Sequence, residues 1–223
     1  MKLGQHVLEA LQAEITGRLR PGDDLVAAGE IGNYGTIQLI MHEKEELRKF
    51  FSESFLRMSM EILKQCAVSP ENDIWSSEKI SASYFAAQGG VLCGLWKIAE
   101  ASGVGLDVDL RKIPIRQETI EICERLDVDP YKLMSEGTVL LGTREGDSLV
   151  NMLERNGVHA AVIGHAERGN ARLLHSGEVC RYLDRPSQDE LTKFTWGVSW
   201  KSEGKIPGIS TCFSGKDKEY GKA

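Results

Sequence analysis

Short apolar runs alternate with amphipathic helical patterns along most of this 223-residue chain. The runs at 25–28, 138–141 and 158–163 have the length and composition of buried strands. Apolar residues at three- and four-residue spacings within 55–63 and 91–98 instead predict helices. Such an alternation is typical of a layered α/β or α+β domain with a mixed sheet.

The rest of the chain extends this pattern at both ends. We expect a short helix over 7–15, a strand within 80–87, a half-exposed strand over 106–110 and a hairpin formed by 172–175 and 179–183. A helix after Pro114 is expected to place Ile120, Cys123 and Leu126 on one apolar stripe. We therefore predict an N-terminal helical segment over 1–19, one domain over 20–194, and an irregular, loosely docked tail over 195–223.

Composition excludes several classes of protein. Lysine and arginine total 27 against 33 aspartates and glutamates, and this acidic balance argues against nucleic-acid binding. No apolar run approaches the roughly 20 residues that cross a bilayer, so no membrane association is expected. The cysteines are dispersed without a CxxC pair, which predicts reduced thiols and a cytoplasmic location.

Two glycine-rich turns are candidate phosphate sites. Gly32 and Asn33 belong to a series running from Gly29 to Gly35, between a predicted strand and a helix. A backbone cradle for phosphate at a helix N-terminus is one interpretation. A tight strand-to-helix turn is the other, and we favour it because the series is not GxGxxG and has no Walker lysine.

Gln88, Gly89 and Gly90 offer the same geometry at the opening of the predicted helix over 91–98. Free N–H groups at a helix start attract anions, and glycine allows a close approach. Tight packing of the helix on a sheet explains the same two glycines. Both interpretations stay open on the residues alone.

The remaining candidates carry weaker signals. Ser135, Glu136 and Gly137 end a loop before a strand. Glu136 is a candidate ligand-binding carboxylate. A lone loop glutamate is more often exposed to solvent, and this is the other interpretation. The histidines lack metal-ligand spacing, and no nucleophile elbow is present. We therefore predict no metal site and no catalytic residue.

Several ordered blocks together resemble one known family. They are Pro21–Asp24 followed by Gly29–Gly35, Gly89–Gly105, Lys112–Arg116, Asp129–Leu133 with Ser135–Gly137, and Ala161–Gly164. These blocks resemble the C-terminal domain of the aminoimidazole ribonucleotide (AIR) synthase superfamily, most closely the AIR synthase-related, hydrogenase maturation factor branch. The resemblance spans about residues 19–194 and implies a three-layer α/β/α domain with a mixed sheet.

Members of this superfamily are usually dimeric, ATP-using enzymes of two domains. The N-terminal domain supplies most ligands of the nucleotide and of magnesium, and the C-terminal domain closes the cleft. The resemblance makes Gly89 and Gly90 the phosphate-side positions and places Glu136 near the cleft.

Two departures from the family pattern weaken the enzymatic interpretation. Only about twenty residues precede the C-terminal-type domain, so the N-terminal ATP-binding domain is missing. The segment before the glycine pair usually reads His-Asp-x-Thr-x-Gly-Gly, whereas Phe85 and Ala87 stand here at the carboxylate and hydroxyl positions. Neither side chain can bind a metal ion or take a proton.

These departures lead to two functional hypotheses. The first is a non-catalytic binding or scaffold module that acts through self-association or a partner. The second is one half of a split ATP-dependent enzyme, completed by a separate N-terminal-type chain, with ATP and magnesium as cofactors only in that complex. Whether the chain alone is an enzyme stays open, although we expect no turnover. The helix within residues 1–19 is a further candidate for covering the exposed domain face.

Overall fold

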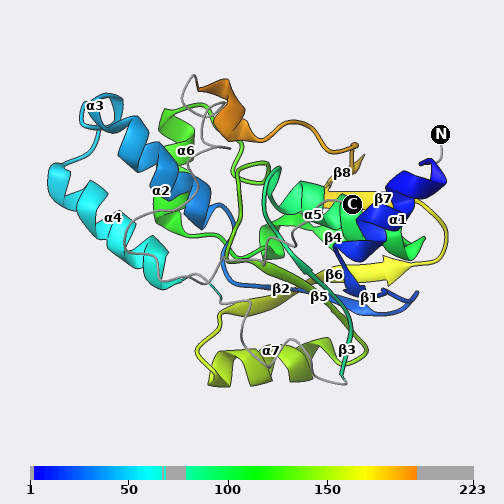
Figure 1. Ribbon diagram of the computed structural model, residues 1–223. Helices are drawn as coiled ribbons and strands as arrows, with labels where there is room; N and C mark the ends of the chain where they lie inside the picture. The colour runs from blue at the N-terminus through cyan, green and yellow to red at the C-terminus, as the bar shows by residue number, and fades with distance from the viewer. Residues whose placement is uncertain (1–2, 67, 69–78, 195–223) are drawn as a thin grey trace, which may run out of the picture.

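A computed structural model describes residues 3–66, 68 and 79–194 (Figure 1). The strands are β1 (Thr16–Gly17), β2 (Asp24–Ala28), β3 (Ile80–Phe85), β4 (Gly105–Asp109), β5 (Val139–Thr143), β6 (Ala160–Glu167), β7 (Arg172–Ser176) and β8 (Val179–Tyr182). The α-helices are α1 (Gln5–Ala13), α2 (Asn33–His42), α3 (Lys44–Leu47), α4 (Glu53–Gln65), α5 (Gly90–Ser102), α6 (Gln117–Arg125) and α7 (Gly146–Arg155). Two 3₁₀ turns, η2 (Leu110–Lys112) and η3 (Glu190–Lys193), complete the described elements.

The strands form one eight-stranded sheet in the order β1-β3-β5-β2-β6-β4-β7-β8. Every neighbouring pair is antiparallel except β4 and β7, which run parallel. The predicted mixed sheet is therefore confirmed. Strands β2 and β5 lie near its centre, and β5 is buried along its whole length, as expected for an apolar run covered on both faces.

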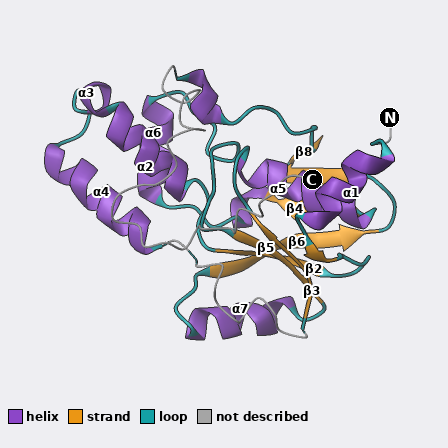
Figure 2. Ribbon diagram, viewed as in Figure 1, coloured by secondary structure: helices purple, strands orange, loops and turns teal. Residues whose placement is uncertain are grey.

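Helices cover both faces of this sheet, which confirms the α/β/α layering (Figure 2). Leu25 and Leu106 point to the face covered by α1 and α5, where they join Ile98 in one core. Val26 and Leu141 point to the opposite face, where they pack with Leu149 of α7. The alternation of side chains along each strand divides the apolar residues between the two layers.

Helices α2, α4 and α6 lie together beside the sheet, on the left in Figure 1. Their own core includes Ile37, Leu56 and Ile122, all of them buried. Ser52 caps α4 by accepting a hydrogen bond from the Phe55 N–H at 3.2 Å. The loops between this helical group and the sheet carry the candidate site.

The N-terminal segment packs against the body of the domain. Leu11, Ile15 and Leu19 are buried in the same core as α5. The Gln12 side-chain amide donates to the Ala101 carbonyl at 3.2 Å, and the Lys97 ammonium pairs with Glu14 at 2.7 Å. Helix α1 thus covers one side of α5. The tail predicted over 195–223 lies outside the described residues.

The apolar stripe predicted for α6 is confirmed at Cys123 and at the partly buried Leu126, but it is wrong at Ile120. Ile120 is 38% exposed, whereas Ile122 is fully buried, and Thr119 and Cys123 are buried beside it. The real stripe follows the same helical periodicity from a different starting residue, because α6 must face α2. Gly35, expected before the helix, lies inside α2, where a Cβ would come within 2.4 Å of the Leu133 side chain.

Among the described residues, none of the helices combines the length and the apolar character that a membrane span requires.

The rotation of α6 gives a direct test by matched substitutions. Because Ile122 is fully buried, we expect Ile122→Ala to lower the free energy of unfolding by about 2–5 kcal/mol. Ile120→Ala, on the exposed side of the same helix, should cost less than about 1 kcal/mol. Chemical denaturation followed by circular dichroism measures both. A larger loss for Ile120→Ala than for Ile122→Ala would show that the original stripe is right, and equal losses would contradict the burial difference seen here.

Candidate functional site

The sheet topology brings the three predicted loops together at one end of the strands. Strands β2 and β3 both pair antiparallel with β5, so the ends of β2 and β3 and the start of β5 lie side by side. The turn at Gly32 follows β2, the turn at Gly89 follows β3, and the loop at Ser135 precedes β5. The predicted site residues are buried or half-buried at this junction, except for Gln88, which is exposed.

Gly32 and Ser135 are held together directly. The Gly32 N–H donates to the Ser135 hydroxyl oxygen at 3.0 Å, and that hydroxyl donates to the Leu133 carbonyl at 2.8 Å. Gly32 has a left-handed backbone at the start of α2, with φ of 72°. Its N–H is therefore used inside the protein, and this turn has the closed geometry of a strand-to-helix connection.

Gly90 is required by packing of α5 against the neighbouring loop. Its φ is +68°, and a Cβ would lie 2.4 Å from the Tyr131 carbonyl oxygen. A side chain at this position would therefore collide with backbone that cannot move aside. Close packing accounts for Gly90, although against the loop at 131–133 and not against the sheet, as the packing interpretation expected.

Gly89 has a different partner, which sequence analysis did not identify. Its N–H donates to Asp189 Oδ2 at 2.6 Å, from a carboxylate only 4% exposed. Asp189 also accepts a hydrogen bond from the Leu191 N–H at 2.9 Å and from the Met134 backbone. A carboxylate at the N-terminus of α5 complements the positive end of the helix dipole. The amide that the sequence assigned to phosphate holds an anion of the chain itself.

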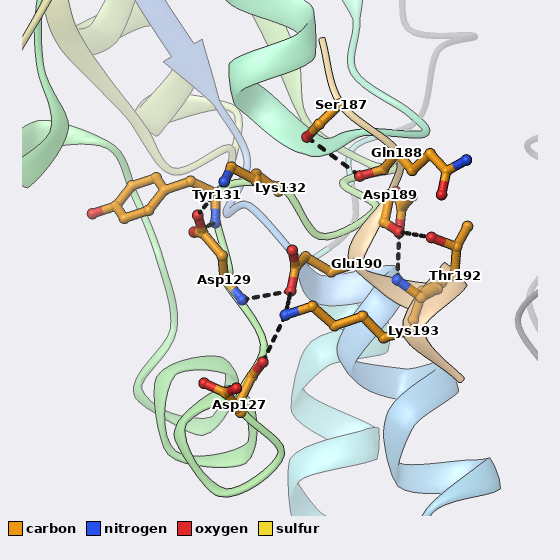
Figure 3. Close-up of polar contacts among 11 residues, drawn as sticks. Asp127, Asp129, Tyr131, Lys132, Ser187, Gln188, Asp189, Glu190, Thr192 and Lys193 are labelled. Carbon is orange, nitrogen blue, oxygen red and sulfur yellow. Dashed lines mark hydrogen bonds and ion pairs between the residues drawn. The ribbon is translucent and has the colours of Figure 1, made fainter. Parts of the chain in front are cut away.

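Residues 186–194, which we call the closing segment, carry this carboxylate across the junction (Figure 3). Leu191 is fully buried among the side chains of the helical group. The Glu190 carboxylate accepts a hydrogen bond from the Asp129 N–H at 3.1 Å and pairs with Lys193, whose ammonium donates to the Asp127 carbonyl at 2.8 Å. Polar and apolar contacts therefore fix the closing segment over the start of α5.

Burial of Asp189 opposes its ionisation. Desolvation raises the pKa of this carboxyl above its usual range, while the hydrogen bonds from Leu191, Gly89 and Met134 lower it. The net direction is upward. The charge at the start of α5 thus depends on a group whose ionised form is costly to bury.

Glu136 is not the exposed loop residue that its isolation suggested. Its carboxyl is half-buried, and desolvation raises its pKa. The Glu136 charge is also the second cause, after burial, of the raised pKa of Tyr34. Gly137, with φ of +90°, accepts a hydrogen bond from the Val68 N–H at 3.0 Å through its carbonyl.

Asn33 has an unusual environment at the start of α2. The residue is only 2% exposed, and neither its amide nitrogen nor its carbonyl oxygen has a hydrogen-bond partner among the described residues. Unsatisfied buried amides are costly and uncommon in proteins. Among the described residues of the junction, Asn33 is therefore the clearest case of a buried side chain with unsatisfied hydrogen-bonding groups.

Two small cavities flank the closing segment where it passes Gly89. One, of about 310 Å³, is lined by Gln88, Lys97, Asp189 and Thr192 among others. The other, of about 110 Å³, is lined by Lys132, Arg181 and Ser187 among others. Gln88 therefore borders a cavity but lies outside the hydrogen-bonded junction.

The residues at this junction do not fit a magnesium–nucleotide complex. Phe85 and Ala87 offer no oxygen ligand at the end of β3, and no three acidic, cysteine or histidine side chains are grouped for a metal ion within the described part of the chain. The Gly89 amide is occupied by Asp189. We derive no phosphoryl-transfer step from these groups.

Comparison with known proteins identifies the domain. The family described as AIR synthase related protein, C-terminal domain, matches residues 20–174. The chain belongs to this family. Carbamoyl dehydratase HypE of Rhodobacter capsulatus is 29% identical over 187 residues, which cover 79% of this chain and 52% of that protein. The putative hydrogenase expression/formation protein MJ0676 of Methanocaldococcus jannaschii is 25% identical over 78% of this chain and 51% of that protein.

Solved structures of AIR synthase-related proteins share the fold. The Escherichia coli HypE structure has a TM-score of 0.60 at 21% identity and covers 77% of this chain and 52% of that one. Thiamine-monophosphate kinase of Stenotrophomonas maltophilia has a TM-score of 0.55 at 19% identity, covering 73% and 53% of the two chains. The present chain spans about half the length of the curated relatives it matches.

Loss of the Asp189 carboxylate should leave buried N–H groups without a hydrogen-bond acceptor. We expect Asp189→Ala to lower the free energy of unfolding by about 1–3 kcal/mol, because the Gly89 and Leu191 N–H groups lose their acceptor. Asp184→Ala removes an exposed carboxylate from the adjoining chain and should be nearly neutral. Urea denaturation of both variants measures the difference. Equal stabilities would contradict the role of Asp189.

The raised pKa of Glu136 predicts a pH-dependent effect. Because the folded state binds this proton more tightly than the unfolded state, the group's contribution to stability falls as pH rises through the usual carboxyl range. Glu136→Gln should therefore raise the free energy of unfolding at neutral pH, and the gain should disappear near about pH 4. Denaturation at the two pH values tests this, with the exposed Glu124→Gln as control. A loss of stability at neutral pH would show that the ionised form is the favoured one.

Proposed function

We propose that this AIR synthase-related domain is a non-catalytic binding or scaffold module that acts through self-association or through a partner. The observation that supports it most strongly is the 2.6 Å hydrogen bond from the Gly89 N–H to the buried Asp189 carboxylate. A phosphate at this amide would have to displace an anion that already has three backbone donors.

The side chains next to Gly89 support the same proposal. Phosphoryl transfer needs cations that bridge the phosphates and an acceptor held in line. Phe85 and Ala87 supply neither a metal ligand nor a proton acceptor. Gly90, the other phosphate-side glycine, is explained by its close approach to the Tyr131 carbonyl.

The proposed partner follows from the length of the relatives. HypE and MJ0676 are about twice as long as the stretch they share with this chain. One related structure is that of a HypE–HypF complex. The match to it covers 54% of the compared chain at 20% identity. We infer that this module docks either on a second copy of itself or on a separate N-terminal-type chain, and that it works in the cytoplasm, where free cysteines such as Cys66 and Cys93 stay reduced.

The second candidate function is one half of a split ATP-dependent enzyme of the hydrogenase-maturation type. Asn33 favours it, because a buried amide without a partner is the feature expected where a second chain or a ligand completes the hydrogen bonds. The raised pKa of Glu136 at the same junction is consistent with a group kept for a complex. In that case the closing segment would have to move away from Gly89.

Calorimetric titration separates the two candidates. Because Asp189 occupies the Gly89 amide, ATP with magnesium should give no binding heat with the full chain alone at micromolar concentrations. Micromolar binding by the isolated chain would contradict the scaffold proposal.

The control for this titration is the same chain mixed with an N-terminal-type domain of a hydrogenase-maturation relative. The scaffold proposal expects complex formation without ATP hydrolysis. ATP turnover in the mixture, absent from either chain alone, would instead establish the split enzyme.

A further inference from the structure

Among the described residues, the helices cover only part of one face of the sheet. Helix α7 packs against β2, β5 and β6, and β4, β7 and β8 continue the same face beyond it. Leu106 and Leu174 point to the opposite, buried face, so Asp107 and His175 point to the open one. Cys180 lies directly opposite His175 in the β7–β8 hairpin and shares that face.

The three side chains meet at one imidazole nitrogen. His175 Nε2 lies 3.2 Å from Asp107 Oδ2 and 4.0 Å from Cys180 Sγ. Three different strands thus bring a carboxylate, an imidazole and a thiol together on the sheet face opposite the one that α5 covers. A thiol in reach of an imidazole nitrogen can transfer its proton to that nitrogen as it attacks. Asp107 faces the same Nε2 as Cys180, so it acts on the imidazole after this nitrogen has been protonated.

Cys180 is also the accessible member of the described cysteines. Its residue is exposed, whereas Cys93 and Cys123 are buried and Cys66 is half-buried. Strand β8 is an edge strand and is exposed along its length, and no other strand of the described part of the chain pairs with its outer side. The imidazole of His175 is 34% exposed, which leaves it able to pass a proton to solvent.

We propose that Cys180 is a thiol-modification site that takes low-molecular-weight disulfides, with His175 as its base. The inference goes beyond the proposed function and does not depend on it, because the groups lie on the opposite face of the sheet from α5. Asp107 accepts a hydrogen bond from Nε2 once that nitrogen has taken the thiol proton, and its charge then stabilises the imidazolium.

The reaction is a thiol–disulfide exchange. His175 Nε2 accepts the proton of the Cys180 thiol as Sγ attacks one sulfur of the disulfide. A new S–S bond forms to Cys180, and the S–S bond of the reagent breaks. Cys180 is oxidised to the mixed disulfide, the other half of the reagent is reduced, and it leaves as a thiolate that takes the proton from His175. The low-molecular-weight disulfide is the only oxidant the step needs.

The test measures the reaction rate of Cys180 in the full chain carrying Cys212→Ser, because Cys212 lies outside the described residues. The probe is an aromatic disulfide that releases a coloured thiolate, and intact-mass spectrometry locates the product. Cys180→Ser should remove the fast phase. His175→Ala should slow that phase by about tenfold or more, the lower end of general-base contributions.

Rescue and control variants distinguish chemistry from structure. Added imidazole should restore part of the lost rate in His175→Ala, an effect that a purely structural role would not produce. Asp107→Asn should slow the reaction and Asp107→Glu should recover part of it. His165→Ala, on the same face but bonded to Asp24 at 2.9 Å, should leave the rate unchanged.

The proposal is overturned if Cys180 reacts equally fast with and without His175, if imidazole restores nothing, or if the fast phase survives Cys180→Ser. Thermal melts of each variant establish that the fold is kept. A variant that fails to fold is replaced by His175→Gln, which retains the size and polarity of the side chain and should show the same loss of rate.

Discussion

The hydrogen bond between the Gly89 N–H and the Asp189 carboxylate connects the middle of the chain to the C-terminal part of the described domain. It joins the start of α5, where the resemblance places phosphate, to a segment a hundred residues further along the chain. The carboxylate is buried, so its interaction with the helix dipole and the backbone donors is little screened by solvent. The functional interpretation of the whole junction depends on which anion occupies this amide.

The closing segment contributes to the fold as well as to the site. Leu191 is fully buried in the core formed by α2, α4 and α6, so release of the segment would expose apolar surface at a cost of about 1.5–3 kcal/mol for this side chain alone. The ion pair of Glu190 with Lys193 and the bond to the Asp129 N–H would also be lost. Opening the junction therefore requires binding energy from a partner. Docking that leaves the closing segment in place requires no such energy.

Much of the architecture could be predicted from the sequence, because strand and helix periodicities report burial locally. The buried strand at 138–141, the alternating strand at 106–110 and the hairpin ending at Leu183 all appear close to their expected positions. The stripe of α6 was wrong at Ile120 alone, since Ile120 and Ile122 are equally apolar and only the contact with α2 decides which is buried.

The candidate site was predictable in part. Gly32, Gly89 and Ser135 lie at one junction because β3, β5 and β2 are neighbours, although their spacing in the sequence gives no sign of this. Asp189 was missed because it lies in a stretch without periodicity, and its partner is distant along the chain. The only local signal was an aspartate two residues before Leu191, a position where Asp caps a helical turn.

The most direct measurement follows the Gly89 amide proton by nuclear magnetic resonance while pH and phosphate are varied. This account predicts that the amide proton exchanges slowly with solvent and that its chemical shift does not respond to phosphate. Its chemical shift should titrate with a carboxyl of raised pKa, and this titration should be lost in Asp189→Asn. Fast exchange together with a saturable chemical-shift change on addition of phosphate to the unmodified chain would contradict the account.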